Sequence, residues 1–257
     1  MKELEVIYMG GPTIIFEIEG LRFITDPTLD PAGSSFSLNE EMTETKTAGP
    51  AMPDPGEIDV VLLSHDQHFD NLDNAGRELL GRTKTVITTA AGAQRLKNAA
   101  IGLLPWEEYH LQGRTGKDII ITGTPARHGP AGVEKITGTV TGFILSVPDA
   151  TPVEIYLTGD TTFYRGIAEV AQRFNPKYVF INAGAARPRG PFNVTMGTND
   201  AIDTAAEFPQ AIIIPLHAEG WSHYTEHNED LVEAFKILGV DSQLNILEPG
   251  RPTALTL

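Results

Sequence analysis

Residues 60–73 read Val60-Val61-Leu62-Leu63-Ser64-His65-Asp66-Gln67-His68-Phe69-Asp70-Asn71-Leu72-Asp73. The apolar run at 60–63 is typical of a strand that is buried on both faces. Two imidazoles and several carboxylates then fall within nine residues. Imidazole and carboxylate together suit Zn²⁺, Mn²⁺ or Fe²⁺. In the alternative, structural interpretation, Asp70 or Asn71 caps a helix and the histidines are exposed loop residues.

Three further predicted strands end a few residues before a side chain that can bind a metal, and those side chains are His128, Asp160 and His217. Ligand sites in α/β sheets gather at the carboxyl ends of the strands. We therefore expect these side chains to meet His65 at one edge of the fold. The structural interpretation would have to treat all four placements as coincidences.

The rest of the chain predicts a layered α/β domain. The first 25 residues alternate like a β-meander with glycine-containing turns, with strands at 5–9, 13–18 and 21–24. Strands are also predicted at 60–63, 118–122, 139–147, 153–157, 178–181, 211–214 and 243–247. Helices are predicted at 72–80, 90–99, 162–174, 199–208 (capped by Thr198 or Asn199) and 228–238. A meander followed by alternating strands and helices fits two sheets between helices.

Residues 26–57 differ from the rest of the sequence. They hold five prolines and many small polar residues, with little periodicity. A loop of this length in a compact domain is usually a lid or a mobile segment. The alternative is an ordered surface excursion without a function.

Composition limits the function classes. The chain has 257 residues, 41% of them hydrophobic, which suits a single domain spanning residues 1–257. A net charge of −15 argues against nucleic-acid and anionic membrane partners. Because there is no cysteine, any metal must be held by histidine, aspartate or glutamate.

The first residues lack the apolar core of a signal peptide, and no aliphatic run is long enough to span a bilayer. We therefore expect a cytoplasmic protein that acts on a small-molecule substrate. The sequence leaves the oligomeric state open, including a homo-oligomer.

In their order and spacing, several motifs resemble the metallo-β-lactamase superfamily of metal-dependent hydrolases, and more narrowly its branch that includes L-ascorbate-6-phosphate lactonase. The motifs are Ile24-Thr25-Asp26-Pro27, the cluster at 64–73, Ala126-Arg127-His128, Leu157-Thr158-Gly159-Asp160-Thr161, Ile214-Pro215-Leu216-His217 and Trp221-Ser222-His223. The resemblance implies a four-layer αββα sandwich. It also implies a hydrolase in which metal-bound hydroxide, formed at neutral pH, attacks the substrate.

The chain departs from the family's first motif, His-x-His-x-Asp-His. Either His65 or Asp66 fills the first place, and we prefer His65 because the site needs imidazole and a short loop can absorb one residue. Asn71 stands in the last histidine place. Its amide oxygen is a poor ligand for Zn²⁺ beside imidazole.

Carried over by position, the resemblance implies a first metal held by His65, His68 and His128. Asp160 would bridge to a second metal, for which Asp70, Asp160 and His217 remain. The expected cofactor is Zn²⁺ or Mn²⁺, with one firmly bound ion and a weaker second site because of Asn71. Asp70 would also orient the attacking water or act as general base.

Four other residues are candidates for substrate contact or proton transfer. His223 would donate a proton to the leaving group or contact the substrate, or else it is a supporting histidine. Asp26 is expected beside the site, or else it binds backbone amides in a turn. Arg187 and Arg189 would capture an anionic substrate, or else they lie in a solvated loop. Asn71 also counts among the residues expected to contact substrate.

The leading hypothesis is hydrolysis of a small ester, a lactone (a sugar-phosphate lactone among them) or a phosphoester. The absence of cysteine argues against a β-lactam substrate. The rival activity is that of a phosphodiesterase or phospholipase-D-like hydrolase. The rival from another class is a degenerate protein that binds a metal or metabolite without turnover.

Overall fold

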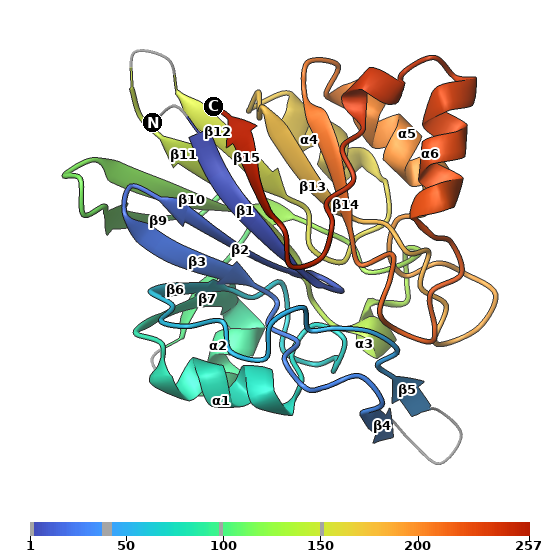
Figure 1. Cartoon of the computed structure of the whole chain (residues 1–257), viewed down its shortest axis with the longest axis horizontal. Coiled ribbons are helices and arrows are strands. Elements are labelled where there is room, and N and C mark those ends of the chain that lie inside the picture. Colours follow the sequence, from blue (N-terminus) through green and yellow to red (C-terminus); the bar gives the residue numbers. More distant parts are fainter. Residues whose placement is uncertain (1–2, 38–42, 98–99, 150–151) are drawn as a thin grey trace.

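Two β-sheets lie face to face, with helices on their outer sides (Figure 1). The computed structural model describes residues 3–37, 43–97, 100–149 and 152–257. The strand order is β15-β1-β2-β3-β6-β7-β8 in the first sheet and β14-β13-β12-β11-β10-β9 in the second. The four-layer αββα sandwich expected from the sequence is confirmed.

The first sheet contains β15 (Pro252–Thr256), β1 (Glu3–Gly10), β2 (Thr13–Ile18), β3 (Leu21–Thr25), β6 (Val60–Leu62), β7 (Thr85–Thr89) and β8 (Ile101–Leu103). The second contains β14 (Ile212–Leu216), β13 (Tyr178–Asn182), β12 (Val153–Leu157), β11 (Thr141–Val147), β10 (Asp118–Pro125) and β9 (Glu108–Gln112). The helices are α1 (Asn74–Arg82), α2 (Ala90–Leu96), α3 (Glu134–Thr137), α4 (Arg165–Ala171), α5 (Thr198–Glu207) and α6 (Asn228–Ile237).

Strand β6 shows why the apolar run at 60–63 has no polar residue. Val60 and Leu62 belong to the core between the two sheets. Val61 points the other way, into the core that Leu79 of α1 also joins. Successive side chains of a strand face opposite sides of the sheet, and both sides are covered here. Helices α4, α5 and α6 cover the outer face of the second sheet in the same way.

The predicted strand at 243–247 is wrong. Residues Asp241–Gln243 form a 3₁₀ turn, and Leu244 makes only an isolated bridge with Ile213. The chain then crosses to the first sheet, where β15 pairs antiparallel with β1. The last strand of the chain is therefore 252–256, and not 243–247.

Several helix ends also differ from the prediction. The side chain of Asp73 accepts a hydrogen bond from the Gly76 amide at 2.9 Å, so α1 begins at Asn74 and residue 72 lies outside it. Helix α5 is preceded by Gly197 as its N-cap, rather than by Thr198 or Asn199. Helix α4 covers only the centre of the predicted range 162–174. Helix α2 ends before the left-handed Lys97, and residues 98–99 of its predicted range lie outside the described residues.

The segment 26–57 is anchored to the body of the protein by a buried ion pair. It contains β4 (Ser35–Ser37) and β5 (Thr43–Thr45), which pair antiparallel, while residues 38–42 lie outside the described part of the chain. The Lys46 ammonium donates to the Thr28 carbonyl at 2.6 Å and lies 3.4 Å from the Asp73 carboxylate. Both charged side chains are at most 2% exposed. The end of β5 is therefore fixed beside the start of α1.

We predict that Lys46→Ala lowers the free energy of unfolding by about 3 kcal/mol, because it leaves a buried carboxylate without its cation. Urea denaturation measures this change. Arg82→Ala is the matched control, since Arg82 and its partner Asp54 are 62% and 76% exposed. That control should cost less than about 1 kcal/mol. Equal losses in the two variants would contradict the structural role of Lys46.

Candidate metal centre

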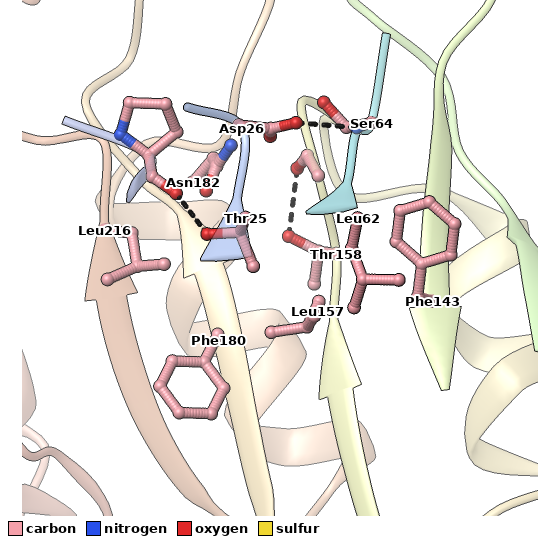
Figure 2. A pocket seen from close by; sticks show the side chains of 12 residues that line it. Thr25, Asp26, Leu62, Ser64, Phe143, Leu157, Thr158, Phe180, Asn182 and Leu216 are labelled. Atoms are coloured by element: carbon pink, nitrogen blue, oxygen red, sulfur yellow. Dashed lines mark hydrogen bonds between the residues drawn. The ribbon is translucent and has the colours of Figure 1, made fainter. Parts of the chain in front are cut away.

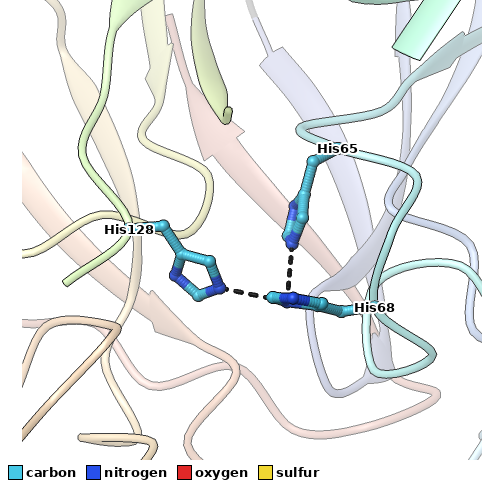
Figure 3. Close-up of side chains that lie close together, drawn as sticks. All are labelled: His65, His68 and His128. Carbon is cyan, nitrogen blue, oxygen red and sulfur yellow. Dashed lines mark hydrogen bonds between the residues drawn. The ribbon is translucent and has the colours of Figure 1, made fainter. Parts of the chain in front are cut away.

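Three histidines from separate parts of the chain converge on one point (Figure 3). His65 Nε2 and His128 Nε2 each lie 3.0 Å from His68 Nδ1. His65 and His68 lie in the loop after β6, and His128 follows β10. Each of these loops leaves the carboxyl end of its strand. The structure therefore brings together the three side chains that the sequence assigns to a first metal.

The outer nitrogens of two of these rings are already bonded. His128 Nδ1 lies 2.8 Å from the Val194 carbonyl, and His65 Nδ1 lies 3.0 Å from the Ser64 hydroxyl. Since a carbonyl only accepts, His128 carries a proton on Nδ1, and Nε2 is therefore the nitrogen that can offer a lone pair to a metal. Metal-binding histidines are ordinarily oriented in this way.

Burial keeps these rings in the form that binds metals. Burial lowers the pKa of His65 well below its usual value. Burial, together with the neighbouring His128, lowers the pKa of His68 to about 4. The two rings are therefore neutral at pH 7, and a divalent cation would not have to compete with a proton for their lone pairs.

Two carboxylates and a fourth histidine adjoin this cluster. Asp160 Oδ2 lies 3.8 Å from His128 Nε2, and Asp160 Oδ1 lies 3.0 Å from His217 Nδ1. Asp70 Oδ2 lies 3.3 Å from His217 Nε2. Asp160 thus stands between the three-histidine cluster and the group formed by Asp70, Asp160 and His217, as a bridging ligand would.

The charges in this second group stabilise one another. Burial alone would raise the pKa of Asp160 and of Asp70, but His217 holds both pKa values below the usual range. In turn, burial would lower the pKa of His217, while the two carboxylates raise it to about 10. Asp70 Oδ1 and Asp160 Oδ2 still have no hydrogen-bond partner among the described residues. Buried anionic atoms without partners fit a cation.

Tight backbone geometry holds these loops in place. Gly159 has a φ of +61°, and a Cβ there would lie 2.8 Å from Ser64 Cβ, so only glycine lets the Asp160 loop pack against the His65 loop. His217 itself has a φ of 58°, and its N–H donates to the Gly11 carbonyl at 2.8 Å. Backbone strain of this kind clusters at functional sites. Asn182 donates to Asp160 Oδ1 at 2.6 Å and orients that carboxylate.

Asp66, the alternative to His65, is engaged elsewhere. Its carboxylate accepts three hydrogen bonds from Arg95 of α2, at 2.5, 2.9 and 3.2 Å. Its carbonyl accepts a further one from Arg77 of α1 at 2.6 Å. The structure thus places His65, and not Asp66, beside His68, while Asp66 is buried against Arg77 and Arg95.

Asp26 and Asn71 are hydrogen-bonded to each other, and Asp26 also contacts the loop that carries His65. Asp26 Oδ1 accepts a hydrogen bond from the Ser64 amide at 2.6 Å, above an apolar layer that includes Leu62 and Phe143 (Figure 2). Asn71 Nδ2 donates to Asp26 Oδ2 at 3.3 Å. Burial raises the pKa of Asp26 to about 7. Both side chains are at most 4% exposed, and their contact with a substrate stays a prediction.

A third group of possible metal ligands includes Glu44, a residue that the sequence analysis did not single out. Glu44 of β5 lies with Asp70 and His223, and one ligand atom of each is within 4.8 Å of the others. His223 Nε2 lies 2.9 Å from Asp70 Oδ2. Glu44 stands in no motif and in the least periodic part of the chain, so no sequence signal marks it. Asn182 was also missed, although its place at the end of an apolar strand is such a signal.

The two candidate arginines differ in their surroundings. Arg187 is exposed, and its Nε donates to Asn193 Oδ1 at 2.6 Å. Arg189 is half-buried, and the structure gives it no hydrogen bond or ion pair within the described ranges. Burial and Asp70 raise the pKa of Glu44 to about 8, and the charge of Arg189 is among those that oppose this shift. Arg189 is therefore close enough to the site to act on an anion there.

The sequence pattern of a beta-lactamase superfamily domain matches residues 21–218, which include the three-histidine cluster and the group of Asp70, Asp160 and His217, but not His223. The chain belongs to the beta-lactamase superfamily. Its curated relatives include the UPF0173 protein YddR of Bacillus subtilis, with 25% identity over 96% of this chain and 98% of that protein. Another is a UPF0173 metal-dependent hydrolase of Solibacter usitatus, with 23% identity over 97% and 99%.

Two solved structures share this fold over nearly their whole length. An isothiocyanate hydrolase from Delia radicum gut bacteria has a TM-score of 0.82 and 23% identity, covering 98% of this chain and 99% of its own. A possible metal-dependent hydrolase from Veillonella parvula has a TM-score of 0.80 and 20% identity, covering 99% and 100%. At these identities the likeness concerns the fold. No helix within the described ranges is long and apolar enough to cross a membrane.

We predict that His128→Ala abolishes stoichiometric Zn²⁺ binding while the protein stays folded. Loss of a residue that only hydrogen-bonds to a metal ligand weakens metal binding by about 10–100-fold. Loss of the ligand itself should weaken it more. Metal analysis after dialysis against Zn²⁺ provides the measurement. His110→Ala, at a 59% exposed histidine on β9, is the control and should retain the ion. Unchanged zinc content in His128→Ala would refute the ligand assignment.

Proposed function

We propose that the chain is a metal-dependent hydrolase that cleaves a small anionic ester or lactone. The observation that carries this proposal is the convergence of three imidazoles, His65, His68 and His128, beside the buried carboxylate of Asp160. Three protein ligands with room for a further one are typical of a catalytic metal site rather than a structural one. The names of the curated relatives, several of which are metal-dependent hydrolases, support the same reaction class.

The donor atoms of the cluster fit Zn²⁺ or Mn²⁺. When bound there, such an ion would polarise the scissile group and make water nucleophilic at neutral pH. Asp160 would hold its charge beside the ion, and Asn182 would keep its carboxylate oriented. Asp70, whose carboxylate remains ionised, would orient the attacking water and accept its proton.

Arg189 supports an anionic substrate. A guanidinium binds carboxylate or phosphate through a planar fork. The chain has a net charge of −15, yet Arg189 is half-buried near the site and forms no ion pair within the described residues. Its guanidinium is therefore free to bind the anionic group of a substrate. A lactone is the first substrate class to test, because the sequence resembles the branch that includes a sugar-phosphate lactonase.

The test is an assay of the Zn²⁺- and Mn²⁺-loaded protein against matched lactones, carboxylic esters and phosphodiesters, each with and without an anionic group. We expect turnover of anionic lactones or esters, and its loss in Asp160→Asn. Preference for phosphodiesters would favour the phosphodiesterase alternative. Stoichiometric metal without turnover of any substrate would favour a protein that only binds metal or metabolite.

For the substrate found in that assay, Arg189→Ala should raise KM by about tenfold or more, since a hydrogen bond to a charged group contributes about 1.5–3 kcal/mol. The analogue that lacks the anionic group should show no such change. Arg187→Ala, on the same loop but bonded to Asn193, is the control and should leave KM nearly unchanged. Equal KM values in wild type and Arg189→Ala would exclude Arg189 from substrate binding.

A further inference from the structure

The group of Glu44, Asp70 and His223 is built like a cation site. The three residues come from β5, from the loop after β6 and from the loop after β14, so the fold brings them together from distant parts of the chain. Glu44 is 5% exposed and Asp70 is 4% exposed. The side chain of His223 is 9% exposed.

Each of the three side chains keeps a buried atom that has no hydrogen-bond partner in the described structure. These atoms are Glu44 Oε2, Asp70 Oδ1 and His223 Nδ1. A buried carboxylate is costly to maintain unless it is paired with a cation or a metal. Glu44 is nearly fully buried, yet it forms no ion pair with a lysine or an arginine among the residues that the structure describes. A divalent cation bound by this group would give the two buried carboxylates a positive partner.

The position that a second ion takes in the resembling family is less suitable here. Both ring nitrogens of His217 already face carboxylates, at 3.0 Å from Asp160 and 3.3 Å from Asp70. Asn71 stands where the resembling family has an imidazole, and its amide donates to the Asp26 carboxylate at 3.3 Å. An ion at that position would lack one ligand and would have to separate existing ion pairs.

We propose that this chain binds its second divalent cation between Glu44, Asp70 and His223, so that a glutamate from segment 26–57 takes the place of the missing imidazole. This inference rests on the proposed metal-dependent hydrolase, because it presupposes a first ion at His65, His68 and His128. The ligand set has two carboxylates and one imidazole. It is harder than the three-histidine set and should prefer Mn²⁺, whereas three imidazoles suit Zn²⁺.

The assignment changes the role of two residues. In this proposal His223 acts as a metal ligand, a role different from the proton transfer, substrate contact or supporting position that the sequence suggested for it. Glu44 couples segment 26–57 to the metal centre. Lys46, two residues further along, fixes the same segment to Asp73, so the carboxylate of Glu44 is held in position before an ion arrives.

The experiment loads the metal-free protein with one equivalent of Zn²⁺ and then titrates Mn²⁺, following free Mn²⁺ by its electron paramagnetic resonance signal. The wild type should bind one Mn²⁺ per chain. Glu44→Gln and His223→Gln should each weaken this binding by about tenfold or more, while Zn²⁺ stays bound. Glu57→Gln, at an exposed glutamate of the same segment, is the matched control and should bind Mn²⁺ like the wild type.

Asn71→His locates the ion independently. If the second ion lies at Glu44, Mn²⁺ affinity does not increase in this variant. Tighter binding in Asn71→His, together with wild-type affinity in Glu44→Gln, would place the ion between Asp70, Asp160 and His217 and overturn the inference. Absence of Mn²⁺ binding to the zinc-loaded wild type would also overturn it.

The first loading step separates this inference from the proposed function. If the protein does not retain one equivalent of Zn²⁺, the proposed function fails. If it retains Zn²⁺ but Mn²⁺ binding does not depend on Glu44, only the second-site assignment fails. A thermal unfolding transition like that of the wild type shows that each variant is folded.

Discussion

The buried contacts of His217 with Asp160 and Asp70 are the interaction on which the rest of the site depends. Two carboxylates that are at most 4% exposed require positive charge close by, and the imidazolium of His217 supplies it when no cation is bound. A divalent ion would supply it more fully. Metal binding and folding stability are therefore coupled in this chain, because the native state alone assembles the ligands.

The fold maintains this arrangement through loops that leave the ends of strands from both sheets. Gly159 lets the Asp160 loop contact Ser64, and His217 is held in a left-handed conformation by its bond to Gly11. Such conformations cost on the order of 1–3 kcal/mol each. The apolar cores on both sides of each sheet compensate for this cost and keep the ligands at fixed positions.

The sequence predicts much of this arrangement because the signals are local. The apolar run at 60–63 and the strand ends before His128 and Asp160 place the ligands without any knowledge of long-range contacts. The preference for His65 over Asp66 came from the need for imidazole, whereas the contact that engages Asp66 elsewhere comes from Arg95 of a later helix and could not be predicted. Glu44 could not be predicted at all, because its position follows from the docking of segment 26–57. The strand at 252–256 was missed because an edge strand is defined by its partner, β1.

The most direct test of the account is anomalous X-ray diffraction from crystals grown with Zn²⁺ and then soaked in Mn²⁺. We predict a zinc peak bounded by His65, His68 and His128, and a separate manganese peak bounded by Glu44, Asp70 and His223. A second peak between Asp70, Asp160 and His217 would contradict the assignment of the second site. Absence of any peak at the three histidines would contradict the metal centre itself.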